Sequence, residues 1–488
     1  MTTNSVLFTY GNLSTSWLYV EETTSTTSAN HLGKLAIHDT SSQCVEEECR
    51  LRKSINRSLY MLMQFQVNFS DHSRYYDFNS IGISMSLAAN AGLRPLMDGR
   101  WNLPVCNVFE PMSDFCEIEG DIRVEGKSSS IYFTSSTNES WRIKPYARKG
   151  DNDAMKYVTE LSIISFLETD KRATAPDCNI NHFTPAIIFS VGGYAGNQFH
   201  AFTEVLLPLY LTSHHFHQEV QFLVTSSQPY WLKMYESIMK QLSRYPIIDI
   251  DKEVDVHCYQ KVTVGLKHHK DLGIDPTKSP KGYSMVDFAE FLRMSYSLER
   301  SSAIKMDGEF LKKNDNKKPR LLILSRKRTR RFTNEDEIVT MAKDLGYEVI
   351  VAEPGVTTTS YNFTHIVNSC DVMVAVHGAG CTNLLFLPSN AILIQVFPLG
   401  PLEEFGRHIY GEPAEAMNLR YLEYKITVEE SSLVEQYPAD HAIFMDPDSF
   451  SEKGWSAVKS VYLDQQSVKL DVGRFKDTLL EALELLHH

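Results

Sequence analysis

Residues 371–397 read DVMVAVHGAGCTNLLFLPSNAILIQVF, two apolar runs separated by a glycine-rich turn. The runs VMVAV and AILIQVF are rich in β-branched residues and lack polar alternation, which is typical of parallel strands buried on both faces. Gly378 and Gly380 permit a tight turn, and a short helix is expected to begin at Thr382 or Asn383. The stretch therefore predicts a strand, turn, helix and strand, which is the repeating unit of an α/β fold.

The turn between the two runs has the composition of an anion-binding site. In open parallel sheets, ligands bind beyond the carboxyl ends of the strands, where free backbone N–H groups and the positive end of a helix face an anion. A glycine lets a phosphate approach the backbone because it has no Cβ. The residues expected to hold a phosphorylated group are His377, Gly378, Ala379, Gly380, Thr382 and Asn383. The alternative is a turn that needs its glycines only for close packing.

Length and charge limit the classes of protein that the chain can belong to. It has 488 residues, too many for a single core, and 43% of them are hydrophobic, as in ordinary soluble globular proteins. The formal net charge of -13 argues against nucleic acid as the main partner, because binding to a phosphate backbone needs a basic surface. We therefore expect two globular domains with extensions.

The pattern along the chain places the boundaries of these domains. Residues 1–95 begin with a Ser/Thr-rich segment and are predicted to be a disordered or stem-like region. Residues 96–314 are predicted to form a first Rossmann-like domain, and residues 315–488 a second one that ends in a closing helix. No run of about 18 apolar residues is visible, so the sequence predicts no transmembrane helix.

A second glycine loop, in FSVGGYAGNQFHAFTE, precedes a helix expected from about Asn197. His200 and Glu204 are four residues apart, so they point from one face of that helix. Either side chain could accept a proton from a substrate hydroxyl while the other orients it. The alternative is a helix-capping histidine with a solvated glutamate.

Basic residues follow the predicted strand RLLILS in the stretch SRKRTRRF. Arginine suits a diphosphate because its planar fork donates paired hydrogen bonds and stays charged when partly buried. Arg326 and Arg330, together with Ser325 at the strand end, are the predicted contacts. A run of charge is more usually a solvated face, and that interpretation applies to the remaining basic residues.

Cysteines and glycosylation triplets bear on the compartment. Cys106 and Cys116 flank a polar loop whose length suits a disulfide, although two buried free thiols are the alternative. Candidate Asn-x-Ser/Thr sites begin at Asn12, Asn56, Asn68, Asn138 and Asn362. Both features are compatible with a lumenal protein.

Metal-binding patterns are weak. The histidines of SHHFH point in different directions on a helix and are interpreted as surface residues, and no zinc-like cysteine spacing occurs. No Asp-x-Asp motif stands at the end of a strand near the candidate site. The sequence therefore predicts no metal and no other cofactor.

The stretches FSVGGYAGNQFHAFTEVLLPLY, LLILSRKRTRRFTNEDE and DVMVAVHGAGCTNLLFLPSNAILIQVFPLG closely resemble plant members of glycosyltransferase family 61. The likeness continues through CEIEGDIRVEGKSSSIYF, WRIKPYARKGD and HCYQKVTVGLKHHKDLGI, and it covers about residues 106–488. It implies the GT-B fold, two Rossmann-like domains facing a cleft. It also implies an inverting enzyme of the Golgi lumen that uses UDP-xylose or UDP-arabinofuranose.

The sequences of these motifs most resemble those of the branch that adds arabinofuranose or xylose to xylan in plant cell walls. The alternatives are an N-glycan core β-1,2-xylosyltransferase and a catalytically silent carbohydrate-binding scaffold of the same fold. Under the enzymatic interpretation, His200 or Glu204 deprotonates the acceptor, and Arg326, Arg330, His377 and the turn amides stabilise the leaving UDP.

The sequence departs from the family pattern in three ways. Family members generally carry an N-terminal membrane anchor, and none is visible here. Glu204 stands where the family usually has Asp, which keeps the acid but changes its reach. Cys381 replaces the more usual Leu.

Overall fold

The computed structural model describes residues 105–136, 138–170, 175–279, 281–306, 318–354 and 360–487, together with the backbone of β1 (Arg94–Pro95) and β2 (Trp101–Asn102). The chain divides into two compact units, Met1–Pro104 and Val105–His488. In the first unit, β1 and β2 pair antiparallel. The sequons at Asn12, Asn56 and Asn68 lie outside the described residues, as do residues 307–317, which include the expected domain boundary.

Val105–His488 holds two sheets, so the predicted α/β class is confirmed. The first sheet is mixed and has the order β11-β10-β9-β12-β4-β5-β7-β6, with β3 on β4 and β8 on β12. Its strands are β3 (Cys106–Asn107), β4 (Phe115–Glu125), β5 (Ser130–Thr134), β6 (Ser140–Ile143), β7 (Leu161–Phe166), β8 (Ile180–Asn181), β9 (Ala186–Ser190), β10 (Gln221–Thr225), β11 (Ile248–Asp249) and β12 (Val256–Val264).

The first sheet differs from a purely parallel Rossmann sheet because β12 joins two kinds of pairing. It runs parallel to β9 on one side and antiparallel to β4 on the other. The tight turn at Gly126 makes β4 and β5 an antiparallel hairpin, as its alternating pattern predicts. The alternating strands and helices around β9, β10 and β11 build a parallel region, and β5 and β7 form a second parallel pair.

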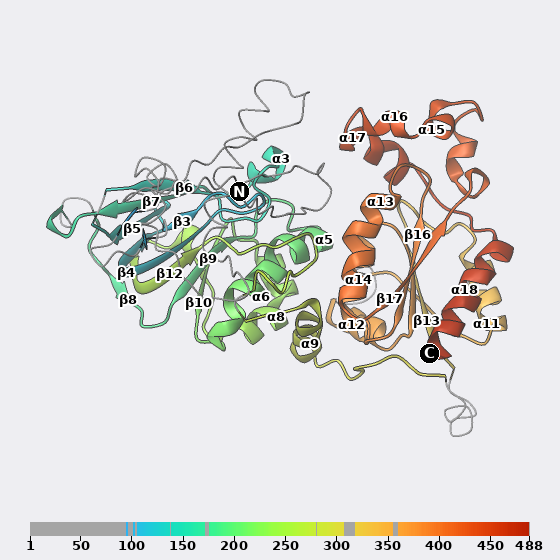
Figure 1. Ribbon diagram of the computed structural model, residues 1–488, viewed down its shortest axis with the longest axis horizontal. Coiled ribbons are helices and arrows are strands. Elements are labelled where there is room, and N and C mark those ends of the chain that lie inside the picture. The colour runs from blue at the N-terminus through green and yellow to red at the C-terminus, as the bar shows by residue number, and fades with distance from the viewer. Residues whose placement is uncertain are drawn as a thin grey trace, which may run out of the picture. The chain divides into compact units, whose positions relative to one another are not determined.

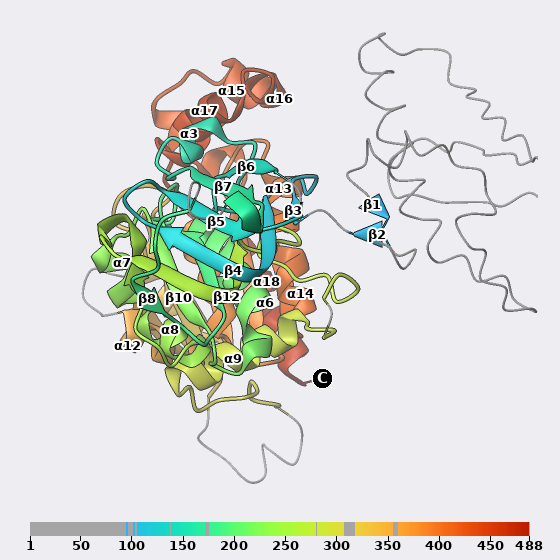
Figure 2. The ribbon, with the colours of Figure 1, turned by 90° about the vertical axis from the view of Figure 1, so that its left-hand side faces the viewer.

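Helices cover one face of this parallel region (Figure 2). In β9, Ile187 and Phe189 pack under the helices, while Ala186 and Ile188 pack into a second core formed with β4, β5 and β7. The helices of this part are α3 (Asn152–Met155), α5 (Gln198–His200), the π-helix η4 (Ala201–Leu206), α6 (Leu207–Ser213), α7 (Pro229–Met234), α8 (Glu236–Leu242) and α9 (Met285–Tyr296), with short 3-10 turns η3 (Glu168–Asp170), η5 (His214–Phe216) and η6 (Ile250–Lys252).

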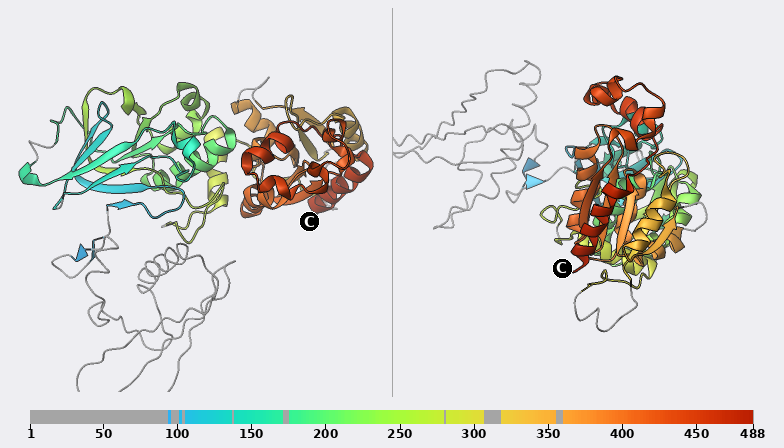
Figure 3. Two further views of the ribbon diagram at one scale, coloured as in Figure 1. Left: turned by 90° about the horizontal axis from the view of Figure 1, so that it is seen from above. Right: turned by 90° about the vertical axis from the view of Figure 1, so that its right-hand side faces the viewer.

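The second sheet is parallel throughout, in the order β14-β13-β15-β16-β17. Its strands are β13 (Arg320–Leu324), β14 (Glu348–Ala352), β15 (Val372–Val376), β16 (Ile392–Phe397) and β17 (Arg420–Lys425). Helices α12 (Ser360–Asn368), α13 (Glu403–Gly406) and α14 (Glu412–Ala416) lie on one side, and α11 (Glu335–Asp344) and α18 (Val472–His487) on the other (Figures 1 and 3). Every residue of β15 and β16 is buried, which confirms the interpretation of the two apolar runs.

The helix after β15 begins earlier than the sequence predicts. The 3-10 helix η7 (Ala379–Phe386) starts directly after Gly378 rather than at Thr382 or Asn383. Gly378 has φ +145°, a conformation that favours glycine, and this residue turns the chain straight from the strand into the helix. The remaining elements are the π-helices η8 (Arg407–Gly411) and η11 (Lys459–Leu463), the 3-10 helices η9 (Val428–Glu430) and η10 (Ser432–Glu435), and α15 (Ala442–Met445), α16 (Asp448–Ser451) and α17 (Trp455–Val458).

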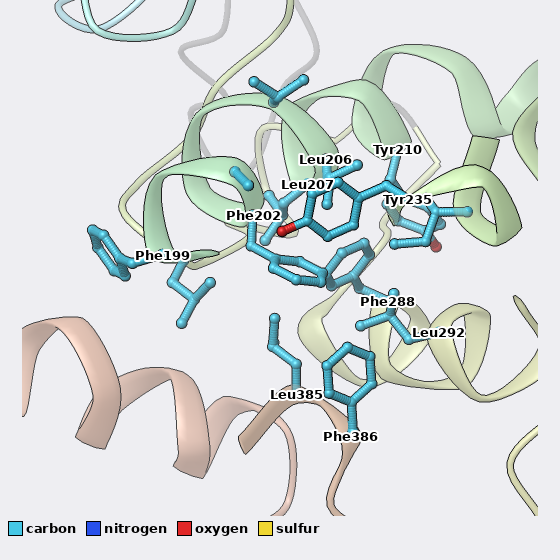
Figure 4. Close-up of a cluster of buried hydrophobic side chains, with 14 of the residues drawn as sticks. Phe199, Phe202, Leu206, Leu207, Tyr210, Tyr235, Phe288, Leu292, Leu385 and Phe386 are labelled. Atoms are coloured by element: carbon cyan, nitrogen blue, oxygen red, sulfur yellow. The ribbon is translucent and has the colours of Figure 1, made fainter. Parts of the chain in front are cut away.

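The two sheets share one hydrophobic core (Figure 4). The Phe202 ring, from η4, meets the Phe386 ring, from η7, edge to face at 5.8 Å between centroids. Tyr296, at the end of α9, contacts the same Phe386 ring at 5.4 Å. The short helix after β15 therefore packs against helices that cover the first sheet.

Two disulfides fasten the first sheet. Cys106 bonds Cys116 and ties β3 to β4, while Cys178 bonds Cys258 and ties the segment before β8 to β12. The second bond joins residues 80 positions apart, and no spacing rule in the sequence indicates it. Within the described ranges, every helix is too short or too polar to cross a lipid bilayer.

Candidate active site

His200 and Glu204 form a hydrogen-bonded dyad at the start of the helix that follows β9. The Asn197 side chain caps this helix by accepting from the Phe199 N–H at 2.9 Å. The helix then widens into the π-helix η4, an arrangement frequent at functional sites, which carries Glu204. The His200 Nδ1 and Glu204 Oε1 atoms are 2.6 Å apart.

Glu204 is completely buried, whereas 21% of the His200 side chain is exposed. A buried carboxylate needs charge and hydrogen-bond partners. Arg148 Nη1 donates to Glu204 Oε1 at 2.6 Å, and the Tyr146 hydroxyl donates to Glu204 Oε2. Burial and the Glu204 charge raise the pKa of Tyr146, so its hydroxyl keeps the proton that it donates. Glu204 thus bonds His200 from the buried side, and His200 is the member of the dyad that is exposed to solvent.

The glycines of the GGYAG loop make room for this network. A Cβ at Gly193 would lie 2.6 Å from the Tyr146 ring, and φ of Gly193 is +59°. A Cβ at Gly192 would lie 2.1 Å from the Tyr157 carbonyl oxygen. These glycines therefore let the loop backbone approach the Tyr157 carbonyl and the ring of Tyr146, whose hydroxyl bonds Glu204.

Arg326 and Arg330 lie together beyond the end of β13, after the half-buried Ser325. Arg330 Nη1 donates to the His377 carbonyl at 2.9 Å, and Arg326 Nε donates to the Thr329 carbonyl at 2.9 Å. Among the described residues, neither guanidinium makes an ion pair, although the charges of Glu353 and Asp464 act on Arg326 and Arg330 respectively. Arg330 Nε has no hydrogen-bond partner there. Burial and the charge of Arg326 lower the pKa of Arg330 to about 10, and burial lowers that of Arg326.

Two neighbouring, half-buried cations that make no ion pair with the described residues can accept an anion, because a bound anion offsets the desolvation of both. The glycine turn closes this anion site. A Cβ at Gly378 would lie 2.3 Å from Arg330 Nη1 and 3.6 Å from Arg326 Nη1. A Cβ at Gly380 would lie 2.6 Å from a methyl of Leu324. Gly378 is thus required because any side chain there would clash with the Arg330 guanidinium.

His377, at the end of β15, is buried and held in one orientation. Its Nδ1 is 2.7 Å from Gln395 Nε2, and Gln395 Oε1 accepts from the Tyr421 hydroxyl at 2.9 Å. Because the Gln395 amide donates, His377 Nδ1 accepts and the ring proton sits on Nε2. Burial and the charges of Arg330 and Arg326 lower the pKa of His377 to about 3, so its ring is a neutral donor.

Asn383 joins the helix after β15 to the helix that carries the dyad. Its Oδ1 accepts from Gln198 Nε2 at 3.0 Å, and its Nδ2 donates to the Gly380 carbonyl at 2.8 Å. The Asn383 side chain is therefore occupied by protein groups, although it was a predicted ligand contact. Thr382 is fully buried and Ala379 half-buried.

Aromatic contacts connect the dyad with the cationic pair. Phe199 lies 5.4 Å from the His200 ring and 5.8 Å from the Tyr410 ring. Tyr410 in turn lies 5.8 Å from the His377 ring. The sequence-predicted residues on the two glycine loops therefore belong to one continuous set of contacts.

Sequence reasoning missed Tyr146, Arg148 and Gln395. The first two stand in WRIKPYARKGD, whose basic residues attract notice without pointing to Glu204. Gln395 is a polar residue inside the otherwise apolar run AILIQVF, and its complete burial in β16 is the signal that marks it as a partner of another polar group.

Other candidates lie away from these contacts. His215 and His217 are exposed, while the His214 ring stacks on Tyr210 at 4.6 Å. Asn138 and Asn362 are exposed. The part of the chain that the structure describes contains no group of three His, Cys, Asp or Glu side chains suited to one metal ion.

Known proteins similar to this chain are glycosyltransferases. The family model for "Glycosyltransferase 61" matches residues 199–394, which hold the dyad, the arginines and the glycine turn. The chain is 44% identical over 404 residues to the alpha-1,3-arabinosyltransferase XAT3 of Oryza sativa subsp. japonica, a match covering 82% of this chain and 68% of the relative. It is 44% identical over 400 residues to the beta-1,2-xylosyltransferase XYXT1 of the same species, covering 78% and 84%. It is 37% identical over 385 residues to the xylan glycosyltransferase MUCI21 of Arabidopsis thaliana, covering 76% and 77%.

The family model and these relatives identify the chain as a glycosyltransferase. The chain belongs to glycosyltransferase family 61.

Proposed function

We propose that the chain transfers a pentose, arabinofuranose or xylose, from a UDP-sugar to a xylan backbone with inversion at the anomeric carbon. The relatives named above are an arabinosyltransferase, a xylosyltransferase and a xylan glycosyltransferase, which supports this acceptor and this class of sugar. Two features support the mechanism: an outward-facing His200 bonded to a buried carboxylate, and two neighbouring arginines that make no ion pair with the described residues.

The proton acceptor in this proposal is His200. Because its Nδ1 bonds Glu204, its Nε2 is left to accept the proton of an acceptor hydroxyl. The hydroxyl oxygen attacks the anomeric carbon as the bond to the diphosphate oxygen breaks, and UDP leaves with that electron pair. Glu204 orients the ring and stabilises the imidazolium that forms, while Arg148 and Tyr146 keep the carboxylate in place.

The leaving group is bound by the second part of the site. Negative charge grows on the β-phosphate as the sugar departs, and Arg326 and Arg330 lie together without an ion pair to any described carboxylate. The neutral His377 ring adds an Nε2–H donor. In this proposal the arginines supply the charge that a divalent cation supplies in other transferases, so transfer proceeds without added metal. The two sheets correspond to the two halves of a GT-B enzyme, and the Golgi lumen is the proposed compartment.

The test is transfer with the purified chain. It would be incubated separately with UDP-xylose and UDP-arabinofuranose and with xylo-oligosaccharides, with and without a chelator. Products would be examined by mass spectrometry and linkage analysis. One added pentose that persists in the chelator is the expected result. Transfer that requires a metal would refute the metal-independent mechanism, and a folded chain that binds UDP but transfers nothing would favour the silent scaffold.

A further inference from the structure

Helices α13 and α17 carry two exposed aromatic rings near the proposed diphosphate site. Phe405, in α13, is 42% exposed and Trp455, at the start of α17, is 51% exposed. Their ring centroids are 5.3 Å apart, with the planes inclined at 57°. Single exposed aromatics are ordinary on protein surfaces, but a touching pair forms an apolar corner.

This corner adjoins the residues proposed to bind the diphosphate. The Phe405 ring lies 6.1 Å from the His377 ring, edge to face. The His377 carbonyl accepts from Arg330, and the His377 ring lies under Gly406, whose Cβ would be 3.0 Å from Nδ1. One residue, His377, therefore touches both the guanidinium and the aromatic corner.

The segment that carries Trp455 is anchored to the same neighbourhood. Trp455 follows Gly454, which has φ +86°, and leads into Tyr462, which is completely buried against Gly400. A Cβ at Gly400 would lie 2.5 Å from the Tyr462 ring. Trp455 is thus the exposed end of a segment whose other end packs into the core.

Gln466 connects this anchored segment with Arg330. Its Nε2 donates to the Tyr462 and Leu399 carbonyls, each at 3.0 Å, and its backbone carbonyl accepts from the Arg330 N–H at 2.6 Å. Gln466 therefore links Arg330 to the buried end of the segment that carries Trp455.

We propose that Phe405 and Trp455 hold the nucleobase of the donor, in a subsite that continues the diphosphate site; this inference rests on the proposed function. A base has two flat π faces and stacks on aromatic side chains, and it is joined to the diphosphate through one ribose. Two rings inclined at 57° can enclose a single planar group, whereas successive sugars of a polymer would need a flat aromatic surface. The corner also lies with the arginines on the second sheet and not with His200, which receives the acceptor.

The test measures binding to the full chain, with the KM of transfer as a second readout. UDP and inorganic pyrophosphate would be titrated by calorimetry into the unaltered chain, Trp455→Ala, Trp455→Phe and Phe405→Ala. Stacking on one aromatic side chain predicts a loss of about 5- to 150-fold in UDP affinity for the alanine variants, with pyrophosphate unchanged and most affinity kept by Trp455→Phe. Phe183→Ala, which removes a 98% exposed ring before β9, is the matched control and should bind UDP normally.

Four outcomes would each overturn the assignment. Equal losses for UDP and pyrophosphate would mean that the rings only support the arginines. Unchanged UDP affinity with a raised KM for xylo-oligosaccharide would make the corner an acceptor platform. An unaltered chain that binds neither UDP nor pyrophosphate would refute the proposed function itself, whereas normal UDP binding by Trp455→Ala would refute only the nucleobase subsite.

Discussion

Replacing Glu204 by Gln tests whether the buried carboxylate drives the outward-facing histidine. Gln keeps the shape of the side chain, but it removes the charge that pairs with the His200 imidazolium across 2.6 Å. It also leaves Arg148 with Asp151, at 2.8 Å, as its remaining acidic partner. The protein should still fold, because Tyr146, Arg148 and His200 keep a hydrogen-bonding partner.

The expected loss follows from the kind of bond removed. Hydrogen bonds to charged groups contribute about 1.5–3 kcal/mol, and the His200–Glu204 bond becomes an ion pair only when His200 takes the proton. If the whole difference appears in the transition state, kcat falls about 10- to 150-fold, because 1.4 kcal/mol corresponds to a factor of 10. The KM for the donor should hardly change, since the arginines bind it.

The assay is initial-rate transfer to a xylo-oligosaccharide, with unfolding temperature measured on the same samples. Glu204→Asp is the matched control, because Asp keeps the negative charge and is the residue that the family usually has at this position. It should retain most of the activity that Glu204→Gln loses. A folded Glu204→Gln protein with unaltered kcat would refute the reasoning, and equal losses in both variants would show that geometry, not charge, is limiting.

Three further predictions follow from other parts of the structure. Arg326→Ala and Arg330→Ala should each weaken UDP binding about 10- to 150-fold in calorimetry, whereas Arg328→Ala, at an exposed position in the same loop, should not; equal affinities in all three would contradict the anion site. In the folded protein the pKa of His377 is about 3, so between about pH 3 and 6.5 only the unfolded chain binds a proton at this residue. The free energy of unfolding should therefore fall as the pH drops from about 6.5 towards 3, by at most about 1.4 kcal/mol per pH unit. Urea unfolding of His377→Gln should show a shallower pH dependence. Removing the Cys178–Cys258 bond by a double Ala substitution opens a loop between residues 80 positions apart and should cost about 2–5 kcal/mol in denaturant unfolding; an unchanged midpoint would mean that the bond contributes nothing.

The sequence predicts the second sheet better than the first for a physical reason. A parallel strand buried on both faces, such as β15, has an unbroken apolar run, so its pattern needs no knowledge of its neighbours. The pairing of β12, parallel on one side and antiparallel on the other, depends on contacts with β9 and β4 that no local pattern records.

The candidate site shows the same division. The spacing of four residues is sufficient to bring His200 and Glu204 together, but Arg148 reaches Glu204 across 56 positions of chain. Likewise, the glycine-rich turns are readily noticed, yet their neighbours, Tyr146 at Gly193 and Arg330 at Gly378, come from distant segments. Long-range partners of buried polar groups are therefore what the sequence alone withholds.

The core shared by the two sheets also bears on how the chain must be made. Leu385 and Phe386 pack among side chains of the helices over the first sheet, and Asn383 bonds Gln198 there. A chain divided near residue 315 would leave both fragments with an uncovered apolar face, and neither fragment would be expected to reach its native state alone. The proposed nucleotide-binding and acceptor-activating parts of the site are therefore expected to form only together, because each needs the core that both share.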